Sequence, residues 1–296
     1  MQKILIKLFL KLNSFFPLKP HPFNEKDTDS DLSYANFELL NAPNVFEKYN
    51  RFGDFQRKIK GKKIVDFACG GGGKSIFLAI NGAREVYGID ISEGFIAQAK
   101  NLALEKKIEK KCHFLVDDAM KSHLPNDYFD MVIFNDAIEH IPDTEKTLQE
   151  ALRVLRPGGK IYINFEGYYY FFGHHLWDVL PIPWLHLFTT ENFRIALYKQ
   201  AVKKFQNGEK RINFRISKDK KGLERISYLN RISVRKFEKI LKKLEKQKLI
   251  KVEANYYSTF NKKIFKILAK LPFLREMFLS TLYFVLEKPK TLKASL

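Results

Sequence analysis

A chain of 296 residues with 45% hydrophobic residues can form one large domain or two small ones and can bury a sizeable core. Its two cysteines, Cys69 and Cys112, exclude a disulfide framework and are typical of a reducing cytoplasm. No apolar run reaches the roughly 18 residues that a membrane-spanning helix needs, and no signal peptide is evident, so we expect a cytoplasmic protein.

The positive charge of the chain is confined to one part of it. The formal net charge is +19, and residues 199–296 hold 27 Lys and Arg against 8 Asp and Glu, so the whole excess lies in this C-terminal third. Such a region suggests an anionic partner, either nucleic acid or a membrane surface. An ordinary lysine-rich surface explains the same composition, and the charge alone does not decide between these interpretations.

The first thirty residues combine a helix with a linker. Residues 1–12 are apolar but are interrupted by Lys3, Lys7 and Lys11, which lie four apart and therefore on one helical face. We expect an amphipathic helix that lies on a membrane or docks on its own protein. Residues 13–30 are polar and contain three prolines, which is typical of a linker.

A glycine-rich turn joins the first predicted strand to a helix. The apolar run 64–67 is followed by four consecutive glycines at 70–73 and then by apolar residues at helical spacing. This order predicts the first unit of a nucleotide-binding α/β fold, in which glycine lets the backbone bend and a ligand approach. The stretch misses both a phosphate loop and the E/D-x-G-x-G-x-G loop of S-adenosylmethionine-binding enzymes by one residue, because Ala68 replaces a glycine in each. The turn alone does not decide between the two loops.

Strands and helices alternate from this turn to residue 165. Ser92 and Asp143 are predicted N-caps of two helices. The segment Arg156-Pro157-Gly158-Gly159 is predicted to end the second helix, because proline cannot continue a helix and glycine takes the turn. Alternating elements predict a doubly wound, mainly parallel sheet of an α/β protein. Further strands are predicted at 85–90, 112–116, 128–134 and 160–165.

Six short motifs over about a hundred residues carry a family resemblance. They are Val65-Asp66-Phe67-Ala68-Cys69-Gly70-Gly71-Gly72, Tyr87-Gly88-Ile89-Asp90-Ile91-Ser92, Asp117-Asp118-Ala119, Phe129-Asp130-Met131-Val132, Ile138-Glu139-His140-Ile141 and Leu155-Arg156-Pro157-Gly158-Gly159. With these motifs, residues 64–165 resemble a class I S-adenosylmethionine-dependent methyltransferase of the UbiE/methyltransferase-11 type. The phosphate-loop alternative explains none of the later motifs.

The resemblance implies S-adenosylmethionine as cofactor and a site along the carboxyl ends of the strands. It implies that Asp66 organises the glycine loop and that Asp90 binds both ribose hydroxyls. Asp118, with the backbone of Ala119, would contact the adenine amino group, and Asn135 would lie beside the methyl group. Lys74 is then only a residue that starts the helix. The implied cofactor-binding residues are Asp66, Ala68, Gly70, Gly72, Asp90, Ile91, Asp118, Ala119 and Asn135.

Catalytic residues are less evident than cofactor-binding ones. Methyl transfer depends mainly on placing the acceptor in line in a site that excludes water, and a general base matters only where the acceptor loses a proton. The candidates are His140, His174 and His175, and His186 and Glu166 are further candidates. We expect no metal site, because no carboxylate or cysteine lies at ligand spacing from the histidines.

Residues 166–228 are predicted to form an aromatic and basic insertion after the fifth strand that binds the substrate. Its aromatic part could wall a pocket for a hydrophobic acceptor, with histidines orienting a polar group. The alternative is a lid that packs on the core. Gly173-His174-His175, Pro183-Trp184 and Leu229-Asn230-Arg231-Ile232 also resemble bacterial methyltransferases of unassigned substrate.

Residues 229–290 are predicted to complete a Rossmann-like sheet of seven strands. A helix follows Ser233, and strands are predicted at 250–258 and 280–286. Between these strands, residues 259–271 are predicted to form a second basic amphipathic helix. The predicted organisation is therefore an N-terminal segment and linker at 1–30, a cofactor-binding core at 31–165, an insertion at 166–228 and the completion of the core at 229–290.

These features favour an S-adenosylmethionine-dependent methyltransferase that acts on a small, hydrophobic or lipid-like acceptor, peripheral on the inner face of an anionic membrane. An RNA methyltransferase that uses the basic C-terminal third ranks lower, because the fourth strand ends in Asn135-Asp136-Ala137 and not in the N-P-P-[YF] motif of base-amino methylases. A third interpretation is a non-catalytic S-adenosylmethionine-binding or membrane-adaptor protein. The sequence indicates neither the acceptor atom nor the oligomeric state.

Overall fold

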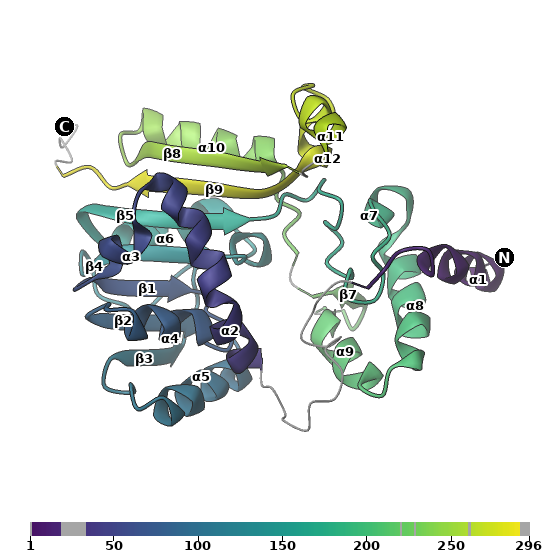
Figure 1. Cartoon of the computed structure of the whole chain (residues 1–296), viewed down its shortest axis with the longest axis horizontal. Coiled ribbons are helices and arrows are strands. Elements are labelled where there is room, and N and C mark those ends of the chain that lie inside the picture. The colour runs from purple at the N-terminus through teal and green to yellow at the C-terminus, as the bar shows by residue number, and fades with distance from the viewer. Residues whose placement is uncertain (1, 19–33, 220, 228, 260–261, 291–296) are drawn as a thin grey trace. The chain divides into compact units, whose positions relative to one another are not determined.

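The structure is a computed structural model of the chain that describes residues 2–18, 34–219, 221–227, 229–259 and 262–290. It comprises two compact units (Figure 1). The sheet unit contains Asp31–Glu166, Val234–Ser258 and Thr281–Leu296. The helical unit contains Met1–Ser30, Gly167–Ser233 and Thr259–Ser280. The predicted boundary between residues 165 and 166 lies one residue from the boundary between Glu166 and Gly167, whereas Thr259–Ser280, predicted as part of the core, belong to the helical unit.

The sheet unit is built on a seven-stranded, mostly parallel sheet of the predicted Rossmann-like type. The strand order is β3-β2-β1-β4-β5-β9-β8, and β9 runs antiparallel to β5. Because the chain leaves β1 toward β2 and β3 and then returns to β4 on its other side, the order reverses beside β1, which is where such sheets bind ligands. The strands are β1 (Lys63–Phe67), β2 (Glu85–Asp90), β3 (Cys112–Val116), β4 (Phe129–Asn135), β5 (Leu155–Phe165), β8 (Lys251–Thr259) and β9 (Leu279–Glu287).

Helices cover both faces of the sheet because successive strand residues point to opposite sides. Ile64 of β1 and Tyr162 of β5 belong to one buried cluster with residues of the helices α2, α4 and α5. On the other face, Phe237 of α10 packs against Phe165 and Phe284, with ring centroids 4.7 and 5.0 Å apart. The helices of this unit are α2 (Tyr34–Glu47), η1 (Lys48–Phe52), α3 (Phe55–Ile59), α4 (Gly73–Ile80), α5 (Glu93–Glu105), η2 (Ile138–His140), α6 (Thr144–Val154) and α10 (Val234–Lys246).

The helical unit has its own small core. Leu176, Leu197 and Tyr198 are among its fully buried residues, and the apolar side chains of Phe9 and Leu10 pack against this core. One side of the N-terminal helix therefore packs against the core of the helical unit. The elements of this unit are α1 (Gln2–Asn13), α7 (Leu185–Phe188), α8 (Glu191–Ala201), η3 (Val202–Lys204), α9 (Gly208–Arg215), the hairpin of β6 (Ile216–Lys218) and β7 (Glu224–Ile226), α11 (Lys263–Leu268) and α12 (Arg275–Phe278).

Two predicted elements differ from the structure. Residues 156–159 form no turn between a helix and a strand; they belong to β5, as a bulge between the paired positions Leu155 and Lys160. Gly158 takes a φ of 76° there, and its N–H donates to the Lys288 carbonyl. The amphipathic helix predicted at 259–271 is also shorter: residue 259 still belongs to β8, residues 260–261 lie outside the described residues, and α11 ends at Leu268. The linker predicted at 13–30 lies largely outside the described residues.

The glycine-rich turn is in direct contact with helix α2. A Cβ atom on Gly73 would lie 2.2 Å from the Ala35 carbonyl oxygen, and one on Gly71 would lie 2.8 Å from the backbone of Ala35. On the other side, a Cβ on Gly72 would lie 2.5 Å from Cβ of Ala99 in α5. These glycines are therefore required by the close approach of two helices, and the interpretation that they are cleared only for a cofactor is incomplete.

We predict that Gly73→Ala lowers the free energy of unfolding by roughly 1–3 kcal/mol, the usual cost of overpacking, because the new methyl group meets backbone that cannot move aside. Gly94→Ala is the matched control: Gly94 lies in α5, and its nearest neighbour is a side-chain oxygen 3.8 Å away. We expect this control to raise stability by about 0.5–1 kcal/mol, the usual gain from replacing a helical glycine. Urea unfolding followed by circular dichroism measures both, and equal effects would contradict the packing described here.

Candidate functional site

The sheet unit gathers polar side chains where β1, β2 and β4 end. Asp66, Asp90 and Asn135 lie at or next to the last residues of these three strands. Since parallel strands end at one edge of the sheet, the fold brings these side chains to the same edge, beside the point where the strand order reverses. The site is described below from the glycine turn outward.

Asp66 and the turn that follows it form a rigid unit. The buried Asp66 carboxylate accepts a 2.7 Å hydrogen bond from the Ser75 hydroxyl, and burial raises the pKa of Asp66 to about 6. Ala68, Gly70 and Gly72 all take left-handed backbone conformations, with φ of 54°, 56° and 76°. A glycine would adopt this conformation without strain, whereas for Ala68 it costs about 1–2 kcal/mol. The alanine therefore keeps the geometry of the loop.

Asp90 links the end of β2 to the glycine turn. One carboxylate oxygen accepts a hydrogen bond from the Gly70 N–H at 3.0 Å, and the other accepts one from the Ser92 N–H at 2.9 Å. Burial raises the pKa of Asp90, while these backbone donors stabilise its charged form. The next side chain, Ile91, is apolar but 61% exposed. Together they present a fixed carboxylate beside an uncovered apolar surface.

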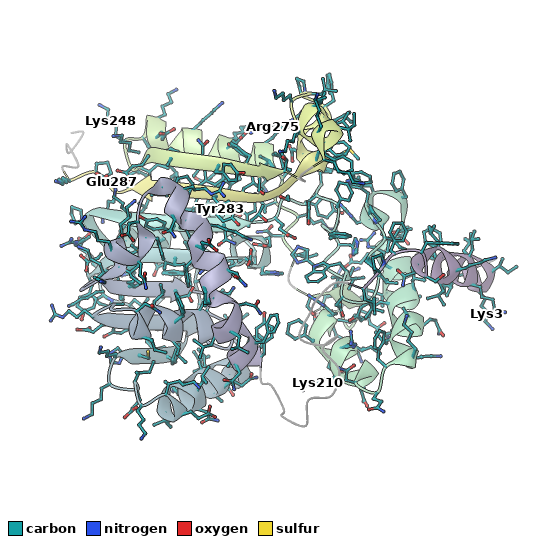
Figure 2. All side chains as sticks on the ribbon, viewed as in Figure 1. Lys3, Lys210, Lys248, Arg275, Tyr283 and Glu287 are labelled. Carbon is teal, nitrogen blue, oxygen red and sulfur yellow. The ribbon has the colours of Figure 1, made fainter. Side chains whose placement is uncertain are left out.

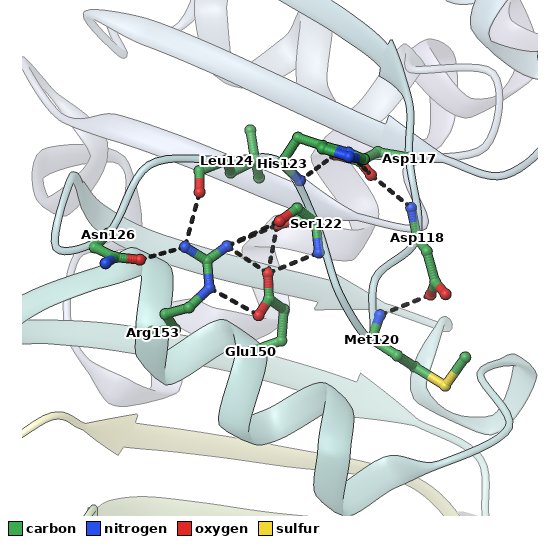
Figure 3. Close-up of polar contacts among 9 residues, drawn as sticks. All are labelled: Asp117, Asp118, Met120, Ser122, His123, Leu124, Asn126, Glu150 and Arg153. Carbon is green, nitrogen blue, oxygen red and sulfur yellow. Dashed lines mark hydrogen bonds and ion pairs between the residues drawn. The ribbon is translucent and has the colours of Figure 1, made fainter.

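The loop after β3 is held by its own carboxylates (Figure 3). Asp117 accepts hydrogen bonds from the N–H groups of Asp118 and His123, and Asp118 accepts one from Met120. Farther along, the Arg153 guanidinium donates to Glu150 and to the carbonyl oxygens of Ser122 and Leu124. The loop that contains Asp118 and Ala119 is thus fixed by hydrogen bonds within it and by the ion pair of Arg153 with Glu150.

A buried charge cluster that the sequence did not predict lies beside the glycine turn. Glu38 of α2 is 5% exposed and accepts a hydrogen bond from the Gly73 N–H at 3.3 Å. The ammonium group of Lys74 lies 4.0 Å from Glu38 and 3.9 Å from Asp136, and it donates to the Asn135 carbonyl. The interpretation of Lys74 as a residue that merely starts a helix is therefore wrong. Glu38 is 35 positions from Gly73 in a segment without a motif, so only the packing of α2 could reveal it.

The charges of this cluster shift each other's protonation. Burial raises the pKa of Glu38 to about 8, although Lys74 lowers it. Burial lowers the pKa of Lys74, but Asp136 and Glu38 outweigh this effect and hold the pKa above its usual range. The cluster therefore holds a permanent cation next to a carboxyl group that is largely protonated at neutral pH.

A second set of polar groups continues the site along β4 and β5. The Asn164 amide donates to Asp136 at 2.6 Å, and the Tyr49 hydroxyl donates to Asn164 at 2.9 Å. The amide nitrogen of Asn135 is buried and has no hydrogen-bond partner among the described residues. Glu139 is buried as well, and burial raises its pKa well above the usual value. An unpaired buried donor costs free energy unless a ligand accepts from it.

The three candidate histidines belong to different units. His140 lies in η2 of the sheet unit, whereas His174 and His175 lie in the helical unit. Both ring nitrogens of His174 are bonded to backbone: Nδ1 accepts from the Leu176 N–H, and Nε2 lies 3.2 Å from the Ile182 carbonyl oxygen. Burial lowers the pKa of His174 well below its usual value. This geometry ties both ring nitrogens of His174 to the backbone of its own loop.

A hollow of the sheet unit lies away from this site. It has a volume of about 330 Å³ and is lined by Arg51, Lys58, Glu253 and neighbouring residues, none of which belongs to the site described above. Within the described ranges, no group of three or more His, Cys, Asp or Glu side chains is arranged to hold a metal ion.

Known proteins resemble this chain in part of its sequence and in its fold. A family model for a methyltransferase domain matches residues 58–177. The fold is shared with the PH0226 protein of Pyrococcus horikoshii OT3, at a TM-score of 0.53 and 20% identity over 90% of this chain and 97% of that one. It is also shared with the [4+2]-cyclase SpnF, at a TM-score of 0.51 and 14% identity over 97% of this chain and 93% of that one. Residues 58–177 therefore contain a methyltransferase domain, whose cofactor is S-adenosylmethionine.

Relatives of similar sequence carry several methyltransferase names. The chain is 33% identical to the chloroplastic tocopherol O-methyltransferase of Arabidopsis thaliana, over 48% of this chain and 42% of that protein. It is 35% identical to phosphoethanolamine N-methyltransferase 2 of Caenorhabditis elegans, over 40% of this chain and 26% of that protein. It is 33% identical to the ubiquinone biosynthesis O-methyltransferase of Coxiella burnetii, over 43% of this chain and 56% of that protein. The match thus spans only part of each relative, and both O- and N-methyltransferases are among them.

We predict a pH-dependent stability that originates at Glu38. Because the pKa of folded Glu38 is about 8 against 4.5 ordinarily, the folded protein keeps a proton that the unfolded chain releases between these two values. The stabilising contribution of this protonation is complete below pH 4.5 and is lost as the pH rises toward 8. As the pH rises from 4.5 to 8, the free energy of unfolding should therefore fall less for Glu38→Gln than for the wild type.

Urea unfolding at a series of pH values measures this difference. Glu93→Gln, at an exposed position of α5, is the control and should follow the wild type. Parallel pH dependences for the wild type and Glu38→Gln would show that Glu38 is ionised in the folded protein.

Proposed function

We propose that the chain transfers a methyl group from S-adenosylmethionine to a small, lipid-like acceptor, and that the cofactor binds at the carboxyl edge of the sheet unit. The observation that carries this proposal is the Asp90 carboxylate, which two backbone N–H groups hold beside the exposed Ile91. A fixed acid at the end of the second strand suits the two hydroxyl groups of a ribose, and the apolar side chain next to it suits a flat base.

The other residues of this edge fit the same cofactor. The buried amide of Asn135 needs an acceptor, which a bound ligand would supply. We assign Asp118 and the backbone of Ala119 to the adenine amino group of the cofactor. We assign the backbone of Gly70 and Gly72, which Asp66 supports, to the amino-acid part of the cofactor. When bound, S-adenosylmethionine supplies a methyl group on a sulfonium that is already electrophilic, so the chain has to orient the acceptor and exclude water.

We assign roles to two further groups of this edge. Lys74 carries a positive charge that Glu38 and Asp136 hold in place, and we assign it to the negatively charged carboxylate of the amino-acid end. Where the acceptor is a hydroxyl group, His140 takes the proton that the acceptor loses. Asn164 and Tyr49 support Asp136 in this arrangement and have no direct part in the reaction.

We predict that Asp90→Ala weakens the binding of S-adenosylmethionine by about 10- to 100-fold, because hydrogen bonds to a charged group contribute about 1.5–3 kcal/mol. Isothermal titration with S-adenosylmethionine measures the affinity, and Glu93→Gln, three positions away on the exposed surface, is the control. Circular dichroism checks that the variant remains folded. Unchanged affinity in a folded Asp90→Ala variant would contradict the assignment of this site.

The transfer reaction is tested with isotopically labelled S-adenosylmethionine and extracts of lipids and small molecules, followed by mass spectrometry. Labelled, lipid-like products identify the acceptor. Binding of S-adenosylmethionine without any transfer would favour the non-catalytic interpretation, which the fold alone does not exclude because it is also that of a protein named as a cyclase.

The lipid-like acceptor is supported by the surface of the helical unit. Helix α1 leaves a row of apolar side chains exposed, among them Ile4 at 72% and Leu8 at 60% exposure, and Phe15 after the helix is 74% exposed. Lys3, Lys7 and Lys11 are exposed on the same helix, and Figure 2 shows Lys3 at its start. None of the described helices is both long and apolar enough to cross a membrane. An exposed apolar row flanked by lysines suits the surface of an anionic membrane.

We predict that the protein cosediments with vesicles that contain anionic lipid and that binding weakens as salt increases, since each well-placed lysine contributes about 1 kcal/mol of electrostatic attraction. The double variant Ile4→Glu, Leu8→Glu should lose this binding. Leu40→Glu is the matched control, because Leu40 is 66% exposed on α2 of the sheet unit. If the wild type shows no binding at low salt, the membrane surface is not a partner.

A further inference from the structure

A buried arginine of the helical unit makes no ion pair with the residues that the structure describes. Arg194 of α8 is only 5% exposed. One of its terminal nitrogens donates to the carbonyl oxygens of His186 and Thr189, and its Nε has no hydrogen-bond partner among the described residues. Among these residues no carboxylate lies within ion-pair distance of the guanidinium. A buried cation without a counter-charge is costly, because desolvation is then not offset by attraction.

The guanidinium of Arg194 lines a small cavity. The cavity has a volume of about 30 Å³, and Tyr168, Gly173, His174 and Arg231 also contribute to its wall. This volume holds a water molecule or the oxygen atoms of one small anion, and it excludes a whole acceptor molecule. The wall joins Gly173 and His174 with Leu229 and Arg231, which belong to two separate stretches that resemble bacterial methyltransferases of unassigned substrate.

The charges around the cavity leave one positive charge uncompensated. Glu191 also lines the cavity, but its carboxylate is already paired with Arg231 at 3.0 Å and accepts from the Ile226 N–H. Burial lowers the pKa of His174 well below its usual value and that of His186 to about 4, so both rings are neutral at neutral pH. The positive charge of Arg194 therefore remains, which matches a ligand with a single negative charge.

The backbone keeps this cavity small and polar. A Cβ on Gly173 would lie 1.9 Å from the Tyr168 carbonyl oxygen and 3.1 Å from Nε2 of His186, so no larger residue fits there. The His186 ring is 5% exposed and packs edge-on against Tyr168, with ring centroids 4.9 Å apart. Neither ring nitrogen of His186 makes a hydrogen bond of good geometry among the described residues. His186 is therefore a buried neighbour of the cavity wall and not part of it.

We infer that this cavity is a binding subsite for one oxyanion, a carboxylate or a phosphate, and that the methyl acceptor carries this group. The second half of the inference rests on the function proposed above; the first half stands on the helical unit alone. Arginine suits this task because its planar fork of N–H donors matches the geometry of carboxylate and phosphate oxygens. The guanidinium of Arg194, whose Nε–H lacks a hydrogen-bond partner among the described residues, supplies such donors, and the neighbouring Arg231 adds electrostatic attraction.

The competing explanation is that Arg194 only holds the chain after α7 through the carbonyl oxygens of His186 and Thr189. In that case the guanidinium is structural, and added anions have no specific effect on it. The two explanations differ in one observable quantity, the response of the Arg194 Nε–H group to an oxyanion.

The test titrates the full chain with sodium phosphate or sodium benzoate at constant ionic strength, with sodium chloride as the reference salt. Nitrogen-15 NMR follows the arginine Nε–H signals, and Arg194→Lys identifies the Arg194 signal by its loss. We expect a saturable shift of this signal with at least one of the two anions and none with chloride, and the anion that binds shows whether the group is a phosphate or a carboxylate. Arg231→Gln should weaken the binding about tenfold or more, as the loss of a charged partner does.

Arg225→Gln is the matched control, because Arg225 pairs with Asp219 in the β6–β7 hairpin and lies outside the cavity wall. No saturable shift, or an equal effect of Arg231→Gln and Arg225→Gln, would overturn the inference. If Arg194→Lys does not fold, the rise in melting temperature on adding each anion, compared between Arg231→Gln and Arg225→Gln, gives the same decision. Titration with S-adenosylmethionine in the same preparations separates the two claims: anion binding without S-adenosylmethionine binding would overturn the proposed function and leave the subsite standing.

Discussion

The close approach of helix α2 to the glycine turn is the contact on which the cofactor edge of the sheet unit depends. Gly71 and Gly73 lie so near the backbone of Ala35 that no side chain fits between them. This contact buries Glu38 against the turn and places its carboxyl group on the Gly73 N–H. The turn is held from the other side by Asp90, which accepts from Gly70. The backbone that faces a ligand is therefore fixed before any ligand binds.

The same contact explains the unusual charge at this edge. Helix α2 removes Glu38 from water, and the cost of this burial is reduced by protonation and by the nearby Lys74. Lys74 in turn lies between Glu38 and Asp136, so one ammonium group is close to two acidic side chains. Such preorganised charge is worth more inside a protein than in water, because it needs no rearrangement when the ligand arrives.

The residues that we assign to the cofactor and to the anion subsite lie in different units. The sheet unit contains all the residues assigned to the cofactor, from Asp66 to Asn135, on elements whose strand order places them at one edge. The helical unit contains the exposed apolar row of α1 and the buried Arg194. The Arg194 guanidinium makes no ion pair with the described residues, whereas that of Arg211, which is also buried, lies 3.4 Å from Asp178. The methyltransferase domain at residues 58–177 lies mostly in the sheet unit.

The sequence by itself determined the order of the elements and the likeness of residues 64–165 to methyltransferases. Strand β2, the capped helices after Ser92 and Asp143, and the seven-stranded sheet could be predicted, because apolar periodicity and capping residues act over a few positions. Only the tertiary structure decided the rest. The contact of Glu38 with Gly73, the burial of Arg194 and the bulge at Gly158 depend on segments that lie far apart in the chain or on strand pairing, and local patterns do not encode which side chains such packing removes from water.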